Sequence, residues 1–518
     1  MLNTMKYALR TATTAAAVAL CTLLLAAGCA GSPTDPDTGS APTASPEKTG
    51  EYAEVNRWMF NYLESHYLWN RAAQQTTPRY TLDYEDFLDD VLTQVAAQDN
   101  INREDGHWEA GKRQYFYSYV ARYRTGSQGR ATRSGTQKTV SGYGFEQLFY
   151  ANFTSGTIAL VVGAVHPEGP AAKAGLQRGD VITRIDGAAI QRNDLTARLN
   201  QFYNDEEGTL KLTLYDMNNG DETRIVEITA ATYDDNPIFA HKVIALDDGR
   251  KAGYLFYNAF NLYYDTALCD RFAAFRTEGI DELILDLRYN GGGHVVSSVL
   301  LATLIAGAPY QGQLFARTTF NEDRRNESHG LYRIGEPQLS DNPGDTYAAL
   351  GTALASALEL KRIYVLTTQS TASASELIIN GLRGLGLEVR LIGETTNGKN
   401  VGMEGLSRIF GSYQYEFSPI TFYISNGKGE SDYSNGFAPD VEFSESDDIW
   451  HTNEAGVTCG TQPGDETYDL LTAAALFWMN RDRKPTIAPA TATRTVPALE
   501  LHTAEVPRRT RPQALLLQ

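Results

Sequence analysis

Residues 363–399, IYVLTTQSTASASELIINGLRGLGLEVRLIGETTNGK, carry a complete strand–helix–strand pattern. The apolar runs at 363–366 and 389–392 each predict a buried strand, and residues 373–385 between them predict a helix. Two strands joined by such a helix are expected to run parallel in one sheet. This return leads the loop after the second strand back toward the start of the helix, so Ser373 and Lys399 are expected to lie close together.

Ser373 and Lys399 are the candidate catalytic residues. Most serines before helices are caps, but the backbone N–H of Ala374 at the helix start could also stabilise an oxyanion. A lysine acts as a general base only when burial lowers its pKa toward neutrality, and the apolar neighbours Val401 and Met403 could bury Lys399. The pattern therefore predicts a Ser-Lys pair that performs acyl transfer without histidine.

The strand and helix alternation also precedes this stretch. An apolar strand is expected at 283–287 and helices at 295–305 and 347–360. This order is typical of βαβ units around a mainly parallel sheet. We therefore expect a multidomain α/β protein whose α/β catalytic domain spans residues 232–482.

Residues 140–231 have a different character, with β-rich runs separated by glycines. The segments PEGPAAKAGL (167–176) and GDVITRIDG (179–187) resemble the short helix, tight turn and hairpin of bacterial PDZ domains. A PDZ domain adds a peptide as a strand to its sheet edge, and backbone N–H groups around Tyr143, Gly144 and Phe145 could bind a terminal carboxylate. The alternative is that the glycines at 142 and 144 only form a tight turn.

Three further regions flank these domains. Apolar residues recur at helical spacing after Glu51, so residues 51–130 are expected to form a helical N-terminal region. Residues 30–50 consist largely of Pro, Ser, Thr and Gly and predict a disordered tether. Residues 483–518 have no periodicity and are expected to be a disordered tail.

Residues 1–29 have the pattern of a signal peptide. Lys6 and Arg10 precede an apolar run that is too short for a comfortable membrane span. The run ends in LAAGC (25–29), which resembles the lipobox of bacterial lipoproteins, with Ala26 where leucine is commoner. The resemblance implies that Cys29 carries lipid and anchors the protein in the cell envelope, at the outer membrane, on its periplasmic or surface face. The alternative is a secretory signal with an incidental cysteine.

The bulk composition excludes several function classes. The formal net charge of -18 argues against nucleic acid as a partner. No spacing of His, Cys, Asp or Glu is typical of a zinc site, and no phosphate-binding Gly-Lys-Ser/Thr loop is present, so no metal or other cofactor is expected. Cys269 and Cys459 could pair in an oxidising compartment. The oligomeric state is not predicted.

The order of these features resembles that of the C-terminal processing (tail-specific) serine peptidases, and the N-terminal part is similar to lipoprotein members of Bacteroidetes type. The shared motifs are LDLRYNGGG (285–293), SASE (373–376) and GETTNGK (393–399), preceded by the PDZ domain. The resemblance covers roughly residues 140–480 and implies a catalytic sheet like those of ClpP and crotonase.

By this resemblance Ser373 is the nucleophile and Lys399 the general base, and the N–H groups of Gly292 and Ala374 form the oxyanion hole. The implied function is a serine endopeptidase that cleaves unstructured C-terminal regions of envelope proteins recruited by the PDZ domain.

This chain departs from the family pattern at three places. The segment from Ser373 to Lys399 is one residue longer, with the extra residue expected in 384–387. Met403 occupies the position where many members have a glutamine that orients the lysine, and Gly291 replaces a proline. The family pattern therefore does not indicate what orients Lys399.

Other interpretations remain open from the sequence. His294 adjoins the glycine turn, and a Ser-His hydrolase would result if it met Ser373, although a histidine at a helix start more often faces solvent. A degenerate peptidase could hold protein C-termini in the PDZ groove without cutting them. The PDZ-like domain of an envelope lipoprotein could also be purely structural.

Overall fold

The computed structural model describes residues 50–109, 111–124, 138–154, 157–326, 330–336, 346–485, 501–503 and 515–516. The expected signal peptide with Cys29 and nearly all of the expected tether lie outside the described residues. Most of the expected tail from residue 483 also lies outside them. Two short pieces of that tail are described as strands, β27 (His502–Thr503) and β28 (Leu515–Leu516), which differs from the expectation of disorder there.

The central sheet follows the predicted alternation of strands and helices. Its strand order is β12 (Ile238–Ala245), β13 (Lys251–Tyr257), β14 (Glu282–Asp286), β18 (Arg362–Thr367), β19 (Glu388–Gly393) and β24 (Val441–Glu442). β12 is antiparallel to β13, and every later pair is parallel. The sequence between 363 and 399 therefore forms the expected parallel return through a helix.

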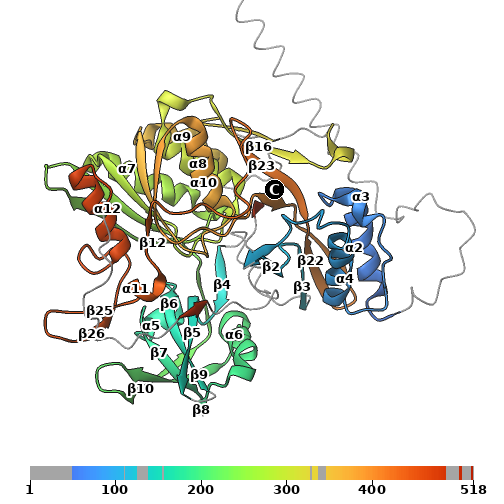
Figure 1. Cartoon of the computed structure of the whole chain (residues 1–518), viewed down its shortest axis with the longest axis horizontal. Helices are drawn as coiled ribbons and strands as arrows, with labels where there is room; N and C mark the ends of the chain where they lie inside the picture. The colour runs from blue at the N-terminus through green and yellow to red at the C-terminus, as the bar shows by residue number, and fades with distance from the viewer. Residues whose placement is uncertain are drawn as a thin grey trace, which may run out of the picture. The chain divides into compact units, whose positions relative to one another are not determined.

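The longer strands of this sheet contribute to two cores because successive side chains point to opposite faces. Leu283 and Leu285 of β14 pack in the core under the helices of one face, whereas Ile284 packs in the core of the other face. Figure 1 shows the first group of helices together above the sheet and α12 apart from them. The first face carries α7 (Asp265–Glu278), α8 (Val295–Ala306), α9 (Thr346–Ser356) and α10 (Ala374–Leu385), and the second carries α12 (Leu470–Arg481).

The PDZ region has its own antiparallel sheet. Its strand order is β10 (Asp221–Thr229), β9 (Thr209–Asp216), β7 (Val181–Ile185), β6 (Thr157–Val165), β5 (Phe145–Thr154) and β27, and β8 (Ala188–Ala189) pairs with β7. β4 (Thr139–Gly142) and β11 (Ala231–Asp234) form a separate two-stranded sheet, and the helices of the region are α5 (Pro170–Lys173) and α6 (Leu195–Asn204). Phe149 and Val161 of this region also pack into the core beneath α12. The PDZ sheet is therefore joined to the second face of the central sheet by buried apolar contacts.

The N-terminal region is helical over a shorter range than expected. It contains α2 (Ala53–His66), α3 (Asn70–Ala73) and α4 (Tyr84–Ala96), and strands β1 (His107–Glu109), β2 (Lys112–Tyr115) and β3 (Tyr119–Arg124) follow. β3 pairs with β22 (Tyr413–Ser418), which in turn pairs with β21 (Leu406–Phe410). Because the partner strand comes almost 300 residues later in the chain, no local sequence pattern predicts this pairing.

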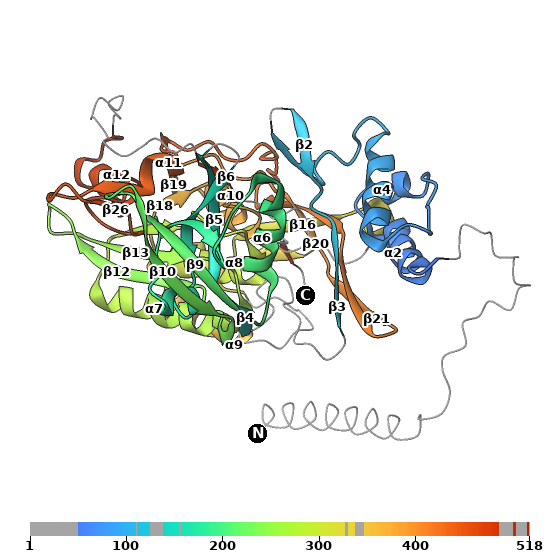
Figure 2. The same cartoon turned by 90° about the horizontal axis from the view of Figure 1, so that it is seen from below.

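A second sheet lies between the N-terminal helices and the central sheet's α10. Its strand order is β15 (Gly293–His294), β28, β20 (Val401–Met403), β23 (Ile420–Asn426), β16 (Leu314–Phe320) and β17 (Leu331–Arg333). Met403 and Ile420 pack in one core with Met59 and Leu63 of α2. Figure 2 shows the blue N-terminal helices beside the orange strands of this part. The strand that follows Lys399 is thus buried under the N-terminal region.

The remaining elements connect these layers. They are α11 (Glu445–Asp448) and the hairpin of β25 (Trp450–Thr452) with β26 (Thr458–Gly460), together with the 3₁₀ turns at Arg192–Asp194, Leu262–Tyr264, Ala308–Tyr310 and Glu322–Arg324. In the described residues no helix combines the length and apolarity that crossing a bilayer requires.

Candidate active site

Ser373 occupies a strained backbone position at the start of α10. Its φ of 63° and ψ of -113° lie in a region that residues other than glycine rarely adopt. Its side chain is fully buried, and its Oγ has no hydrogen-bond partner among the described residues. A strained residue with an unsatisfied hydroxyl costs free energy and persists where function requires it, which marks Ser373 as a candidate nucleophile.

The turn that carries Ser373 is tied to the loop after β14. Thr371 Oγ1 donates to the carbonyl of Leu287 at 2.8 Å, and the Ala372 N–H donates to the carbonyl of Asn290 at 3.1 Å. Ser375 Oγ donates to the same Asn290 carbonyl at 2.9 Å. The glycine turn at 291–293 is thereby held against the serine turn.

Lys399 lies in the loop between β19 and β20 and is only 1% exposed. Its Nζ lies 4.8 Å from the centroid of the Tyr117 ring. Burial lowers the pKa of Lys399 to about 7, although the negative charges of Asp105 and Glu376 oppose this shift. A lysine with a pKa near 7 is neutral often enough at physiological pH to accept a proton.

Glu376 connects the two candidate residues through their backbones. One of its carboxylate oxygens, Oε2, accepts from the N–H of Ser373 at 2.9 Å and from the N–H of Lys399 at 2.8 Å. The other, Oε1, accepts from the Gly398 N–H at 2.7 Å and from Thr396 Oγ1 at 2.6 Å. The structure therefore brings the Ser373 and Lys399 backbones together on one buried carboxylate.

No role was predicted for Glu376, although its spacing from Ser373 carries a signal. A glutamate three residues after a serine at a helix start is the capping-box spacing, which places the carboxylate near the first N–H groups of the helix. Here the carboxylate also accepts N–H groups from the lysine loop. Burial raises the pKa of Glu376, and the hydrogen bonds it accepts oppose that shift.

Gly292 lies directly against Ser373. A Cβ atom on Gly292 would stand 2.8 Å from the Cβ of Ser373, and its φ of 110° also favours glycine. The N–H of Gly292 donates to Asn290 Oδ1 at 2.9 Å, so this predicted oxyanion donor is engaged within its own loop. Ala374 is the first residue of α10, where the helix offers its N–H no acceptor.

Tyr117 lies beside Lys399 and carries a hydroxyl, whereas Met403 cannot orient the lysine through a hydrogen bond. Met403 is buried in the core shared with the N-terminal helices and carries no hydrogen-bonding group. The hydroxyl of Tyr117 donates to Asn397 Oδ1 at 2.8 Å, two residues before the lysine. Tyr117 precedes Asn397 by 280 positions, so no spacing argument could connect it with the site.

Asp105 fixes the segment that carries Tyr117. Its Oδ1 accepts from the backbone N–H groups of Tyr117 at 3.0 Å and Ser118 at 2.8 Å, and its Oδ2 accepts from the hydroxyl of Tyr67 at 2.7 Å. Burial raises the pKa of Asp105, against the effect of these hydrogen bonds. The sequence offered no indication of this role either.

His294 is not solvent-facing as the sequence suggested, because it is only 1% exposed. Its Nδ1 lies 3.3 Å from the carbonyl of Phe260. Since Oγ of Ser373 has no partner in the described part of the chain, neither the His294 imidazole nor Lys399 Nζ is hydrogen-bonded to it in this structure. Burial lowers the pKa of His294 to about 4, which keeps the ring neutral at physiological pH.

The predicted carboxylate loop opens strand β5 of the PDZ sheet. The side chains of Tyr143 and Phe145 are buried in the PDZ core, and Gly144 has a φ of 83°. The carbonyls of Tyr143 and Gly144 accept from the N–H groups of Ala171 and His166, both at 2.8 Å. The loop is therefore anchored to α5 on one side and leads into β5 on the other, a strand that pairs with β6 and β27.

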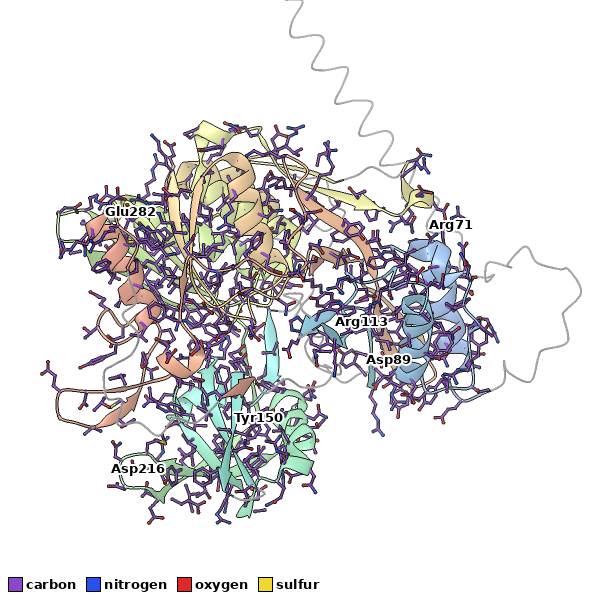
Figure 3. All side chains as sticks on the ribbon, in the orientation of Figure 1. Arg71, Asp89, Arg113, Tyr150, Asp216 and Glu282 are labelled. Atoms are coloured by element: carbon purple, nitrogen blue, oxygen red, sulfur yellow. The ribbon has the colours of Figure 1, made fainter. Side chains whose placement is uncertain are left out.

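A groove of about 610 Å³ runs between the PDZ sheet and the serine turn. Phe149 and Tyr150 of β5 line it on the PDZ side, and Thr368, Gln369 and Ser370 line it on the catalytic side. Figure 3 labels Tyr150 on the PDZ sheet. The groove thus extends from the PDZ edge to within three residues of Ser373.

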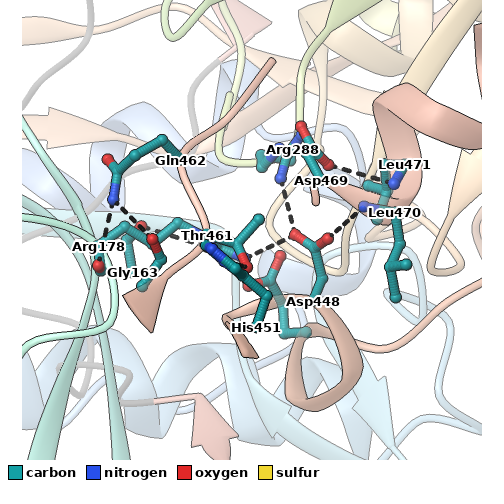
Figure 4. A network of polar contacts seen from close by, with 12 residues as sticks. Gly163, Arg178, Arg288, Asp448, His451, Thr461, Gln462, Asp469, Leu470 and Leu471 are labelled. Carbon is teal, nitrogen blue, oxygen red and sulfur yellow. Dashed lines mark hydrogen bonds and ion pairs between the residues drawn. The ribbon is translucent and has the colours of Figure 1, made fainter. Parts of the chain in front are cut away.

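Arg178 of the PDZ region enters a buried charge network of the catalytic region, drawn in Figure 4. It pairs with Asp448 at 2.9 Å and with Glu445 at 3.0 Å. Asp448 also pairs with Arg288 at 3.1 Å, which in turn pairs with Asp469 at 2.7 Å. Arg288 precedes Asn290 by two residues, so this network joins the PDZ domain to the glycine turn beside Ser373.

Cysteines and metal ligands add no further site in the described part of the chain. Cys269 and Cys459 are both free thiols, so no disulfide joins them. Among the described residues no cluster of His, Cys, Asp and Glu side chains has the arrangement of a metal site.

Comparison with known proteins identifies both domains. Residues 251–443 match the family Peptidase_S41, described as peptidase family S41, and residues 161–199 match a PDZ domain. These matches confirm the predicted peptidase and PDZ domains.

Named relatives agree with these domain matches. The chain is 28% identical over 285 residues to the chloroplastic C-terminal processing peptidase of Tetradesmus obliquus, covering 52% of this chain and 54% of the relative. It is 28% identical over 276 residues to the carboxyl-terminal-processing protease of Picosynechococcus sp., covering 53% and 58%. The chain therefore spans about half the length of the curated relatives it matches.

A solved structure covers more of the chain. The crystal structure of a protein described as an S41 protease from Bacteroides fragilis NCTC 9343 is similar with a TM-score of 0.60 at 26% sequence identity. The similarity extends over 82% of this chain and 97% of that chain. It supports the mixed α/β fold predicted from the sequence, including the helical N-terminal region.

Proposed function

Because the chain carries a peptidase family S41 domain and a PDZ domain, we propose that it is a serine endopeptidase that cleaves unstructured C-terminal regions of proteins. In this proposal Ser373 is the nucleophile and Lys399 the general base. The observation that supports the proposal is the shared carboxylate oxygen of Glu376, which accepts from the backbone N–H groups of both residues and so brings the backbones of a buried serine and a buried lysine together.

The proposed reaction proceeds in two steps. Oγ of Ser373 attacks the carbonyl carbon of the scissile bond while Lys399 Nζ takes the hydroxyl proton; the C–N bond then breaks, and the proton passes to the leaving amine. In the second step a water molecule adds to the acyl carbon, Lys399 accepts its proton, and the ester bond to Ser373 breaks as the proton returns to Oγ. The Ala374 N–H at the start of α10 is placed to stabilise the oxyanion in both steps.

Substrate recruitment is proposed to use the PDZ domain. A peptide strand would add to the side of β5 that does not face β6, the position that β27 holds in this structure, and the groove of about 610 Å³ leads from there toward the serine turn. A flexible protein end can follow such a path, whereas a folded domain cannot enter it.

A binding protein that does not cleave is the second candidate. It is favoured by the N–H of Gly292, which donates to Asn290 Oδ1 and is therefore not offered to an oxyanion in this conformation. In this case the PDZ edge and the groove would hold protein ends without turnover.

One assay separates the two candidates. Residues 50–518 are given a fluorogenic peptide with an apolar C-terminus, and cleavage is compared with that by Ser373→Ala and Lys399→Ala. The exposed residues Ser65 and Lys361 provide matched controls, Ser65→Ala and Lys361→Ala, which are expected to cleave at the parent rate. Unchanged cleavage by Ser373→Ala or Lys399→Ala would eliminate the pair, and binding without cleavage by all five proteins would favour the binding protein.

We also propose that Cys29 is lipidated and anchors the enzyme in the cell envelope, with envelope proteins as substrates. The signal-like pattern and the LAAGC segment before residue 30 support this. Labelling of cells with a fatty-acid probe is expected to mark the parent and not Cys29→Ala. Equal labelling of both would contradict the proposal.

A further inference from the structure

A short segment of the chain adds a strand to the PDZ edge. β27 pairs antiparallel with β5, with His502 opposite Tyr150 and Thr503 opposite Phe149. The other edge of β5 is already taken by β6, so β27 occupies the position where an extended peptide would join the sheet. Leu501, the residue before it, packs against the core that joins the PDZ sheet to the central sheet and lines the groove.

A second piece of the same segment lies beside the candidate catalytic residues. β28 runs parallel to β15 and β20 and stands between them, with Leu515 opposite Gly293 and Leu516 opposite both His294 and Met403. β15 begins one residue after Gly292, and β20 begins two residues after Lys399. β28 thus bridges the glycine turn and the strand that follows the lysine.

The groove begins at the PDZ-edge position and extends toward the serine turn. Its lining includes Phe149 and Tyr150, which pair with β27, and Ser370 on the turn before Ser373. The chain between Thr503 and Leu515 can reach about 40 Å when extended, since each residue spans roughly 3.3–3.6 Å. One continuous segment can therefore supply both the strand on β5 and the strand between β15 and β20.

Charge also favours this segment as an occupant. The sequence between the two strands, AEVPRRTRPQA (504–514), contains three arginines and a single glutamate. The groove is lined by the carboxylates of Glu109, Glu394 and Glu445 and by no lysine or arginine among the described residues. Glu445 is already paired with Arg178, so the attraction of a basic segment to the groove comes from Glu109 and Glu394.

We propose that residues 501–516 are a built-in, substrate-like ligand that fills the PDZ edge and the strand position between β15 and β20. This inference rests on the proposed function and deepens it. The segment competes with substrates supplied by other proteins, and its sequence indicates their class: an extended strand on β5, a basic linker, and a leucine-rich strand beside Ser373.

The inference is tested by binding in the full chain carrying Ser373→Ala, where no cleavage is needed. The probe is a fluorescent peptide with the sequence of residues 501–518, and the readout is its anisotropy. Leu516→Pro removes a backbone N–H from β28 and is expected to release the built-in strand. Because a tethered competitor acts at an effective concentration in the millimolar range, the probe should then bind about tenfold tighter or more.

Controls distinguish this effect from general disturbance. Ala492→Pro lies outside both strands and is expected to leave the probe affinity unchanged, whereas Thr503→Pro in β27 should raise it as Leu516→Pro does. Equal affinity for the parent, Leu516→Pro and Thr503→Pro would overturn the inference. A gain in affinity that disappears on dilution of the protein would also overturn it, because the competing strand would then come from a second copy.

Activity separates this inference from the proposed function. With Ser373 restored, Leu516→Pro is expected to lower KM for an unrelated peptide about tenfold at unchanged kcat. Absence of cleavage in every variant, together with tighter binding by Leu516→Pro, would reject the endopeptidase and keep the built-in ligand. Cleavage by all variants with the same KM would keep the endopeptidase and reject the built-in ligand.

Discussion

Ser373 and Lys399 donate their backbone N–H groups to the same atom, Oε2 of Glu376, at 2.9 and 2.8 Å. The serine begins a helix and the lysine ends a loop that returns from the next strand. A single buried carboxylate therefore sets the distance between two backbones that separate elements bring together.

Glu376→Gln is expected to lower kcat about 10²-fold with little change in KM, since a small misplacement of reacting groups has an effect of that size. All four groups that contact the carboxylate are donors, and the glutamine NH₂ can accept from none of them. The free energy of unfolding should fall by about 1–3 kcal/mol for each donor left without an acceptor. Steady-state kinetics and thermal unfolding measure both effects.

The control for this variant is Glu282→Gln. Glu282 is also buried and bridges Arg250 and Arg362, but it lies at the opposite end of β14 from the serine turn. The Glu282→Gln variant should have a lower free energy of unfolding, while its kcat stays at the parent value. A similar loss of kcat in both variants would show that Glu376 contributes stability alone.

The pH dependence of cleavage should follow Lys399. Because burial lowers its pKa to about 7, the neutral form that accepts a proton increases as pH rises through that value. We expect kcat/KM to rise about tenfold per pH unit below 7 and to level off above it. A flat profile between pH 5.5 and 8.5 would contradict the role of Lys399 as the base.

The lowered pKa of Lys399 should also make the free energy of unfolding depend on pH. A lysine whose pKa is lower in the folded chain binds fewer protons there than in the unfolded chain between pH 7 and its ordinary pKa near 10.4, so stability rises with pH in that range. Lys399→Met lacks this dependence. The Tm advantage of Lys399→Met over the parent is expected to be greatest at pH 7 or below and to shrink toward pH 10.

Tyr117→Ala tests whether the N-terminal region tunes the lysine. Loss of the ring admits water to Lys399, which reverses the desolvation that lowers its pKa. The kinetic pKa should rise by about one unit or more, so that activity at pH 7 falls while activity at pH 9 recovers. Tyr115→Ala, on the neighbouring strand β2, should lose stability without moving the kinetic pKa.

Arg178→Met tests the buried connection between the PDZ and catalytic regions. Removal of one cation leaves Asp448 and Glu445 buried with less compensation, so the free energy of unfolding should fall by about 3–5 kcal/mol. Burial and the nearby carboxylate of Asp469 raise the pKa of Asp448, and Arg178 opposes them.

The loss in Arg178→Met should depend on pH. When the pKa of a carboxyl group is raised in the folded chain, the free energy of unfolding falls as pH increases through that pKa. The loss of stability in Arg178→Met relative to the parent should therefore be larger at pH 8 than at pH 5.5. Thermal unfolding at the two pH values measures this difference. An equal deficit at both would indicate that Arg178 contributes packing and not charge.

Much of the fold followed from local patterns. Strands at 363–366 and 389–392 were predictable because a buried parallel strand is apolar on both faces, and the helix from 374 was predictable from its length and flanking turns. The PDZ domain was recognisable because its glycines stand at turns that few other residues can adopt. By contrast, strand β3 was missed because it depends on a partner, β22, that comes almost 300 residues later in the chain.

The sequence by itself determined the two domain types, because each follows from motifs that are local in the chain, and it predicted the pair Ser373 and Lys399, which lies within one strand–helix–strand unit. Only the tertiary structure decided what surrounds Lys399, since Tyr117 and Asp105 come from a region almost 300 positions earlier. The placement of β27 and β28 was decided in the same way. A strand that adds to an edge is bound mainly through its backbone, and backbone hydrogen bonds leave little trace in the side chains that a sequence records.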